Sequence, residues 1–136
     1  MTKHILKLTV AAALLGVAGV AGAHHSTAMF DMAKDVTLEG TIKDFQWTNP
    51  HTWIVFEVPN STGGTDEYGI EGMSPNYLAR AGWSKRSLNP GDKVELVIHP
   101  LKDGRKGGFN VSVKFADGKI IYNLPRAPGQ TPENTR

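Results

Sequence analysis

The sequence predicts a small, mainly β domain in which five to six strands close into a barrel and one helix lies between strands three and four. Three observations predict this fold. Apolar and polar residues alternate over several short segments, and these segments are separated by Gly, Pro, Asn and Asp, as in strands joined by turns. One segment carries the start and stop signals of a helix. The first strand is long and contains Gly40, which suits the sharp coil that a small closed barrel requires.

The first strand is predicted over residues 35–47, because apolar and polar side chains alternate from Val36 to Ile42. The alternation then slips by one residue, since Phe45 and Trp47 are apolar where the earlier pattern would place polar side chains. Such a slip is typical of a β-bulge, in which one extra residue bends the strand.

The later elements are shorter runs between turn residues. The run at 51–58 is apolar at both odd and even positions, which indicates a central strand covered on both faces. The helix is predicted between Ser74, a good N-cap, and Gly82, a good C-cap, with Pro75 at its first position. The strands after the first are predicted at residues 51–58, 66–71, 93–99, 109–115 and 119–124.

This order of elements is that of the oligonucleotide/oligosaccharide-binding (OB) barrel, whose helix plugs one end between strands three and four. A small β-sandwich with a helical insertion is the alternative. The OB-like domain is predicted over residues 35–124, and an extended arm at residues 24–34 precedes it. We expect the tail at residues 125–136 to be disordered, because it has three prolines and no large apolar residue.

Residues 1–23 are predicted to be a cleavable signal peptide. Lys3 and Lys7 precede an apolar run from Leu8 to Val20. The run is followed by Ala21-Gly22-Ala23, a small-x-small site of the kind that signal peptidase accepts. The run is shorter than the roughly 20 residues that a membrane-spanning helix needs, which favours a cleaved signal peptide. An uncleaved membrane anchor is the alternative. The mature chain is therefore expected to begin at His24, to be periplasmic or secreted, and to contain no membrane span.

The composition limits the classes of function. The chain has 15 Lys and Arg against 13 Asp and Glu, and removal of Lys3 and Lys7 with the signal peptide would leave 13 of each. A balanced surface gives no electrostatic reason to expect a nucleic acid as partner. The chain contains no cysteine, so thiolate metal sites and cysteine nucleophiles are excluded and a metal site would use nitrogen and oxygen ligands.

The histidines at the start of the expected mature chain are the main candidates for chemistry. Cleavage after Ala23 would free the α-amine of His24, and this amine and the His24 imidazole can chelate one metal ion together. A second imidazole completes a three-nitrogen set, called a histidine brace, that favours Cu(II). His51 is the candidate for that imidazole, because it lies in the loop between the first two strands, next to the usual ligand face of such barrels. His25 and Asp31 are candidates for a further ligand.

Interpretations in which these histidines bind no metal ion also remain open. His24 and His25 can form a solvated terminus, and His51 can fill a turn and hydrogen-bond to the backbone. His99 has the same strand parity as Lys93 and Glu95, so we expect it to face solvent rather than to bind a metal ion.

Aromatic side chains supply a second hypothesis. Trp47, Trp53 and Trp83, together with Asn49, are candidates for a surface on which a sugar or a base stacks. The alternative is that the aromatic residues form the core of a small domain without disulfides. The sequence shows no nucleophile elbow and no phosphate-binding loop that leads into a helix, so it favours a binding protein over an enzyme.

Several short motifs resemble those of a known family and together cover nearly all of the expected mature chain. They are HHS at 24–26, FD at 30–31, LEGTI at 38–42, WTNPH at 47–51, AGW at 81–83 and SLNPGD at 87–92. They resemble a domain-of-unknown-function family of small exported bacterial proteins. The resemblance implies a periplasmic or secreted β-barrel-like domain and supplies no catalytic residues, so the copper hypothesis rests on the residues alone.

The expected function is therefore that of an exported periplasmic binding protein, with copper as the candidate cofactor. The alternatives are a β-barrel that binds a small ligand or carbohydrate, and a protein-interaction module of the cell envelope. A metal ion or a small ligand is the expected partner, and the sequence indicates no particular protein partner.

Overall fold

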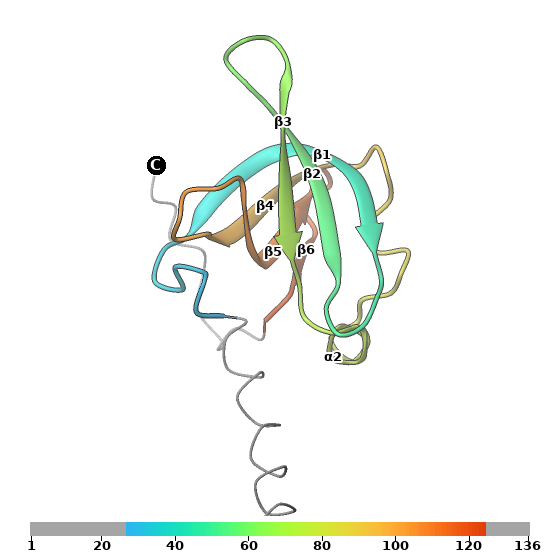
Figure 1. Cartoon of the computed structure of the whole chain (residues 1–136). Helices are drawn as coiled ribbons and strands as arrows, with labels where there is room; N and C mark the ends of the chain where they lie inside the picture. The colour runs from blue at the N-terminus through green and yellow to red at the C-terminus, as the bar shows by residue number, and fades with distance from the viewer. Residues whose placement is uncertain (1–26, 125–136) are drawn as a thin grey trace, which may run out of the picture.

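The computed structural model describes residues 27–124. This part of the chain contains six strands and one helix, joined by turns and loops. Every predicted element is present, and its ends lie within two residues of those expected. Figure 1 shows the strands wrapped around a central core, with the helix at one end of the barrel. The elements are β1 Val36–Gln46, β2 Trp53–Pro59, β3 Thr65–Glu71, α2 Pro75–Arg80, β4 Lys93–Pro100, β5 Gly107–Phe115 and β6 Ile120–Tyr122.

The strands form one sheet in the order β3-β2-β1-β4-β5-β6, and an additional pairing of β3 with β5 closes the first five strands into a barrel. The β3–β5 pairing is parallel, whereas all other neighbours are antiparallel. This is the OB-like topology that the sequence predicts, with β6 as an extra strand on β5. The prediction of the fold class is therefore confirmed, and the β-sandwich alternative is excluded.

Strand β1 belongs to both halves of the barrel, because its first half pairs with β4 and its second half pairs with β2. Two features bend it along this path (Figure 1). Gly40 lies so close to the carbonyl of Glu57 that a Cβ there would collide with the backbone. The register shifts between Ile42 and Asp44, which confirms the predicted bulge.

The barrel closes where the backbones of β3 and β5 approach each other at glycine residues. Gly69 pairs with Gly107 and Ile70 pairs with Gly108. A Cβ on Gly107 would lie 2.6 Å from the carbonyl oxygen of Gly69, closer than real Cβ atoms come to other atoms. The absence of side chains at this seam therefore permits the parallel pairing.

The expectation that the second strand is covered on both faces is wrong. Ile54 and Phe56 of β2 point into the core, but Trp53 on the opposite face is 38% exposed. The doubly covered strand is β5, which is buried from Gly107 to Val113. An apolar residue on the outer face of a sheet looks the same in the sequence whether or not another segment covers it.

The described part of the N-terminal arm, residues 27–34, forms tight turns rather than the expected extended segment. The arm is attached to the barrel through Phe30, which is buried and whose ring centroid lies 5.5 Å from that of Phe109. The amide of Asp31 donates to the carbonyl of Pro100 at 2.8 Å, and the amide of Lys102 donates to the carbonyl of Met29 at 2.9 Å. The arm therefore packs against the end of β4 and the start of the β4–β5 loop.

His99 does not face solvent as expected, because the chain just before β1 covers it. Its side chain is 13% exposed, and its Nδ1 lies 3.1 Å from Oδ1 of Asp35 and 3.0 Å from the carbonyl oxygen of Lys34. His99 is therefore part of the contact between β4 and the segment leading into β1.

Helix α2 begins as predicted. The hydroxyl of Ser74 accepts a hydrogen bond from the amide of Tyr77 at 3.3 Å, and Pro75 occupies the first turn. Leu78 and Trp83 enter the hydrophobic core from the helix and the residues after it. Among residues 27–124, no helix is both long enough and apolar enough to cross a membrane.

We expect Gly107→Ala to destabilise the protein by about 1–3 kcal/mol, because the added methyl group would force β3 and β5 apart at the seam. Urea unfolding measures the effect. The matched control is Gly64→Ala in the β2–β3 loop, where a Cβ meets only the Asn60 side chain at 3.7 Å or more and the change should stay within about 0.5 kcal/mol. Equal stability of the two variants would contradict the proposed role of the glycine seam.

Candidate functional site

A shallow hollow of about 530 Å³ lies where the β1–β2 loop meets the outer face of β2 and β3. It is lined by Gln46, Thr48, Asn49, Pro50, His51, Trp53 and Glu71. Three of the predicted site residues, Asn49, His51 and Trp53, therefore lie together. This loop and these two strands form the surface on which OB barrels bind their ligands.

Thr52 holds the β1–β2 loop against the end of β3. It is buried, and both its amide and its hydroxyl donate to the carbonyl oxygen of Met73, at 3.1 and 3.0 Å. The amide of Gly72 donates back to the carbonyl of Thr52 at 2.9 Å. These three hydrogen bonds place His51, just before Thr52, beside Glu71, just before Gly72.

Two buried asparagines, Asn110 and Asn123, are hydrogen-bonded beneath the same corner of the barrel. Oδ1 of Asn123 accepts a hydrogen bond from the amide of Met73 at 2.9 Å, and its Nδ2 donates to the carbonyl of Asn110 at 2.7 Å. Asn123 and Asn110 are both almost completely buried. The backbone beneath the hollow is therefore fixed by hydrogen bonds that are buried away from water. These bonds keep the site in one geometry.

The imidazole of His51 contacts the carboxylate of Glu71. Nδ1 of His51 lies 2.5 Å from Oε1 of Glu71, and the two side chains are 34% and 16% exposed. The contact is an ion pair when the ring is protonated, but it is not aligned as a hydrogen bond, and the buried Nδ1 has no hydrogen-bond partner. A tautomer with the proton on Nδ1 would turn this N–H toward the carboxylate and leave the lone pair on Nε2. Nε2 lies on the other side of the ring and makes no hydrogen bond to the described residues.

The indole of Trp53 lies over the backbone of β3. A Cβ on Gly69 would be 2.6 Å from Cζ2 and 3.3 Å from Cε2 of Trp53, so the ring occupies the space above this glycine. The indole therefore has one side against β3, while 38% of the residue remains exposed. Trp53 and Glu71 are direct partners in the β2–β3 register, so the ring and the carboxylate are neighbours on the outer face.

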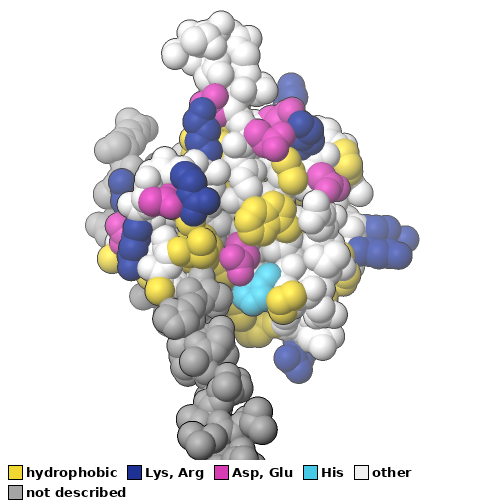
Figure 2. Space-filling model, viewed as in Figure 1, with side chains coloured by type: hydrophobic (Ala, Val, Ile, Leu, Met, Phe, Trp, Pro, Cys, Tyr) yellow, Lys and Arg dark blue, Asp and Glu magenta, His cyan; other side chains and the backbone are white. Residues whose placement is uncertain are grey.

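The outer face beyond Trp53 carries one lysine paired with two glutamates, which together leave one net negative charge. Nζ of Lys43 lies 2.7 Å from a carboxylate oxygen of Glu67 and 3.5 Å from one of Glu57. The hydrogen bond and the charge of Glu67, followed by the charge of Glu57, raise the pKa of Lys43. Figure 2 shows acidic and basic side chains interspersed with hydrophobic ones on the face turned to the viewer. The hollow itself is lined by one acidic residue, Glu71, and by no Lys or Arg.

The other predicted site residues lie elsewhere. Trp83 is buried in the core, and its Nε1 donates to the carbonyl of Tyr122 at 3.0 Å. Trp47 is half-buried against the core, with its ring centroid 5.9 Å from that of Phe45. Asp31 lines a different hollow beside the β4–β5 loop, and its carboxylate accepts a hydrogen bond from the amide of Ala33 at 3.3 Å. His24 and His25 lie outside the described residues.

Glu71 is the charged residue of the hollow, and the sequence prediction did not name it among the site residues. A signal for it was present in the spacing of the β2–β3 hairpin. Residues pair symmetrically about the loop, from Pro59 with Thr65 to Trp53 with Glu71. The predicted strands and this symmetry together would have placed Glu71 opposite Trp53.

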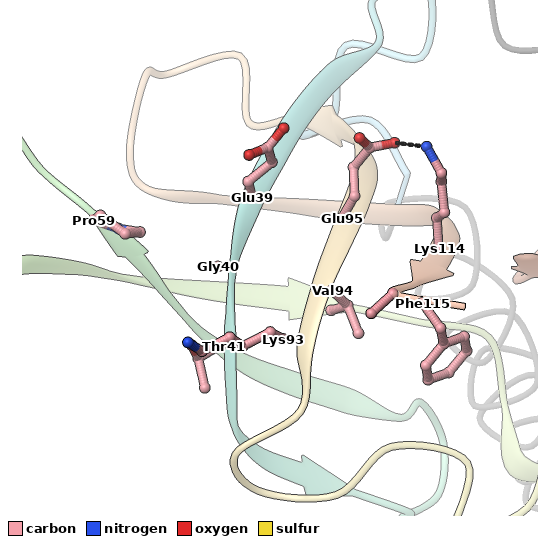
Figure 3. A pocket seen from close by; sticks show the side chains of 10 residues that line it. Glu39, Gly40, Thr41, Pro59, Lys93, Val94, Glu95, Lys114 and Phe115 are labelled. Carbon is pink, nitrogen blue, oxygen red and sulfur yellow. Dashed lines mark ion pairs between the residues drawn. The ribbon is translucent and has the colours of Figure 1, made fainter. Parts of the chain in front are cut away.

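A second hollow, of about 480 Å³, lies over β1, β4 and the end of β5 (Figure 3). Glu39 and Glu95 are direct cross-strand neighbours there, and Lys114 lies 3.8 Å from Glu95. Its walls contain none of the predicted site residues. Within residues 27–124, no group of three or more His, Asp and Glu side chains is arranged to hold a metal ion.

We expect Gly69→Ala to displace the Trp53 indole, because the new methyl group would occupy the position of its six-membered ring. The three tryptophans give three indole N–H signals in a two-dimensional NMR spectrum. The Trp53 signal should shift strongly, whereas the signal of the core residue Trp83 should stay in place. Gly64→Ala again provides the control. An unchanged Trp53 signal in a folded Gly69→Ala protein would show that the ring does not rest on β3.

Neither the curated proteins nor the solved structures contain a significant match to this chain. A family model does match, and it spans residues 12–110, more than half of the sequence. This match confirms the resemblance that the short motifs indicate. The chain belongs to DUF6152, a family of unknown function.

Proposed function

We propose that this protein is an exported copper-binding protein in which the amine and imidazole of His24, together with the imidazole of His51, hold one Cu(II) ion. The observation that carries the proposal is the contact between Nδ1 of His51 and the carboxylate of Glu71. With the proton on Nδ1, the lone pair of Nε2 is on the side of the ring away from Glu71, and His51 lines an open hollow on the usual ligand face of the barrel.

The contact places Nδ1 of His51 beside a carboxylate, as in many metal-binding histidines, although the two groups are not aligned as a hydrogen bond. Histidine ligands commonly donate their second ring N–H to a carboxylate, which fixes the tautomer and makes the ligating nitrogen more basic. Glu71 also brings a negative charge close to the proposed ion. Imidazole and amine nitrogens are the ligand types that suit Cu(II), and no thiolate is present to favour a softer metal.

The attachment of the arm supports a meeting of His24 with His51. Phe30 packs on Phe109, and Phe109 is the direct partner of Glu71 in the β3–β5 register. Neighbouring strands are about 4.8 Å apart. Residues 27–30 form a turn, so the reach comes from the three residues before Thr27, which span up to about 10 Å when extended, or about two strand spacings.

Export would be part of the site's chemistry under this proposal. Cleavage after Ala23 would place the protein in the periplasm or outside the cell and would also create the free amine of His24. His25 is the neighbouring candidate for a further ligand. Asp31 is left out of the proposed ligand set, because it lies in another hollow and hydrogen-bonds to the amide of Ala33.

Titration with Cu(II) tests the proposal on mature protein that begins with an authentic His24. We expect one ion to bind, with nitrogen couplings in the electron paramagnetic resonance spectrum and with quenching of Trp53 fluorescence. A variant that keeps one extra Met before His24 should lose the tight site, because its amine is no longer on the histidine. His51→Ala should lose it as well, since the second imidazole is removed.

The variant Glu71→Gln refines this test. It preserves the size of the side chain but removes its charge, so copper affinity should fall by about 10- to 100-fold while one ion still binds. Thermal unfolding of each apoprotein serves as the folding control. Equal binding by the authentic and the Met-extended proteins, or no binding by either, would rule out the proposed ligand set.

A further inference from the structure

The exposed ring of Trp53 points to a ligand other than a metal ion. Most tryptophans of a small barrel are buried, as Trp83 is, but Trp53 is 38% exposed and lies over Gly69 on the outer face. The glycine leaves room for the indole to lie against the strand. An aromatic ring supported on one side and open on the other is a surface on which a second ring can stack.

Polar groups surround this ring on the side of the β1–β2 loop. The side-chain amide of Asn49 makes no hydrogen bond to the residues that the structure describes, so its two donors and its acceptor are open to a ligand. Glu71, directly opposite Trp53 in the strand register, supplies carboxylate acceptors. Both residues line the same hollow as Trp53, so stacking and hydrogen bonding can act on one molecule.

The charge of the hollow decides which class of ring it accepts. Its seven lining residues include Glu71 and no Lys or Arg, and nearby Lys43 is already paired with Glu67 and Glu57. Phosphate groups depend on cationic side chains for binding, so a nucleotide or a nucleic acid strand is disfavoured. A neutral ring with hydroxyl groups can hydrogen-bond to Asn49 and to the carboxylate of Glu71, and it brings no anionic group next to that carboxylate.

We propose that this hollow binds a neutral sugar, with one pyranose ring stacked on Trp53 and its hydroxyl groups hydrogen-bonded to Asn49 and Glu71. The volume of about 530 Å³ falls within the range of small-molecule sites, and the open shape leaves room for further sugar units on either side. This inference does not rest on the copper proposal, because it uses neither His24 nor a metal ion.

The test uses the Met-extended protein in the presence of EDTA, so that copper at the His24 amine cannot contribute. Cellotriose and N-acetylated chitotriose are the probes, and a short oligothymidylate is the nucleic acid comparison. With at least one of the two sugars, the indole N–H signal of Trp53 and the side-chain amide signals of Asn49 should shift in NMR titration, whereas the Trp83 signal should not. The oligothymidylate should cause no such shift.

Two variants with a matched control separate stacking from general surface effects. Trp53→Ala should weaken sugar binding by about 10- to 100-fold, and Trp53→Phe should retain part of it because a ring remains. Ile120→Ala is the control, since Ile120 is 36% exposed on β6, does not line the hollow, and should leave binding unchanged. The proposal is overturned if neither sugar shifts the Trp53 signal at millimolar concentration, if folded Trp53→Ala binds as well as the parent, or if the oligothymidylate binds better than both sugars.

Discussion

The close approach of β3 and β5 at Gly69 and Gly107 is the constraint on which the rest of the structure depends. Without a side chain at Gly107, the two backbones pair in parallel and the sheet becomes a barrel. The same pairing sets Glu71 beside Phe109, on which Phe30 of the arm packs. If the seam were open, β3 would be an edge strand, and the N-terminal arm, which packs on Phe109 of β5, would have no fixed relation to Glu71 and the β1–β2 loop.

The corner beneath the hollow is held by polar groups rather than by apolar packing alone. Thr52, Asn123 and the backbone around Met73 satisfy one another in a water-excluded position. Each of these bonds contributes modestly to stability, but an unpaired group in this position would cost about 1–3 kcal/mol, so alternative loop conformations are disfavoured. A site on this corner keeps its shape before any ligand arrives, which lowers the entropic cost of binding. This argument applies equally to an ion at His51 and to a ring on Trp53.

The elements of the fold could be predicted from the sequence because they depend on local patterns. Alternation, the slip after Ile42 and the N-cap of the helix act over a few residues and were found where expected, whereas the C-cap is Ala81 and the expected Gly82 follows it with a positive φ. The predictions of burial were wrong where a segment far away in the sequence determines whether a side chain is covered. Trp53 is exposed although its strand is apolar on both parities, and His99 is covered by a segment more than sixty residues away in the sequence. In the hollow, Asn49, His51 and Trp53 lie close in sequence and could be grouped, whereas Glu71 required the register of the hairpin.

Glu71 is adjacent to both candidate binding groups of the hollow, the imidazole of His51 and the indole of Trp53. Its carboxylate contacts the ring of His51, and its position in the register sets it opposite Trp53. A single negative charge therefore borders both the proposed ligand nitrogen and the proposed stacking surface. A cation at Nε2 of His51 would draw on that charge and weaken the carboxylate as an acceptor for a hydroxyl group, and a hydroxyl group bound to the carboxylate would in turn weaken its support of the cation. Any coupling between the two ligands should thus pass through Glu71, and because binding linkage is reciprocal, each ligand would alter the affinity of the other by the same factor.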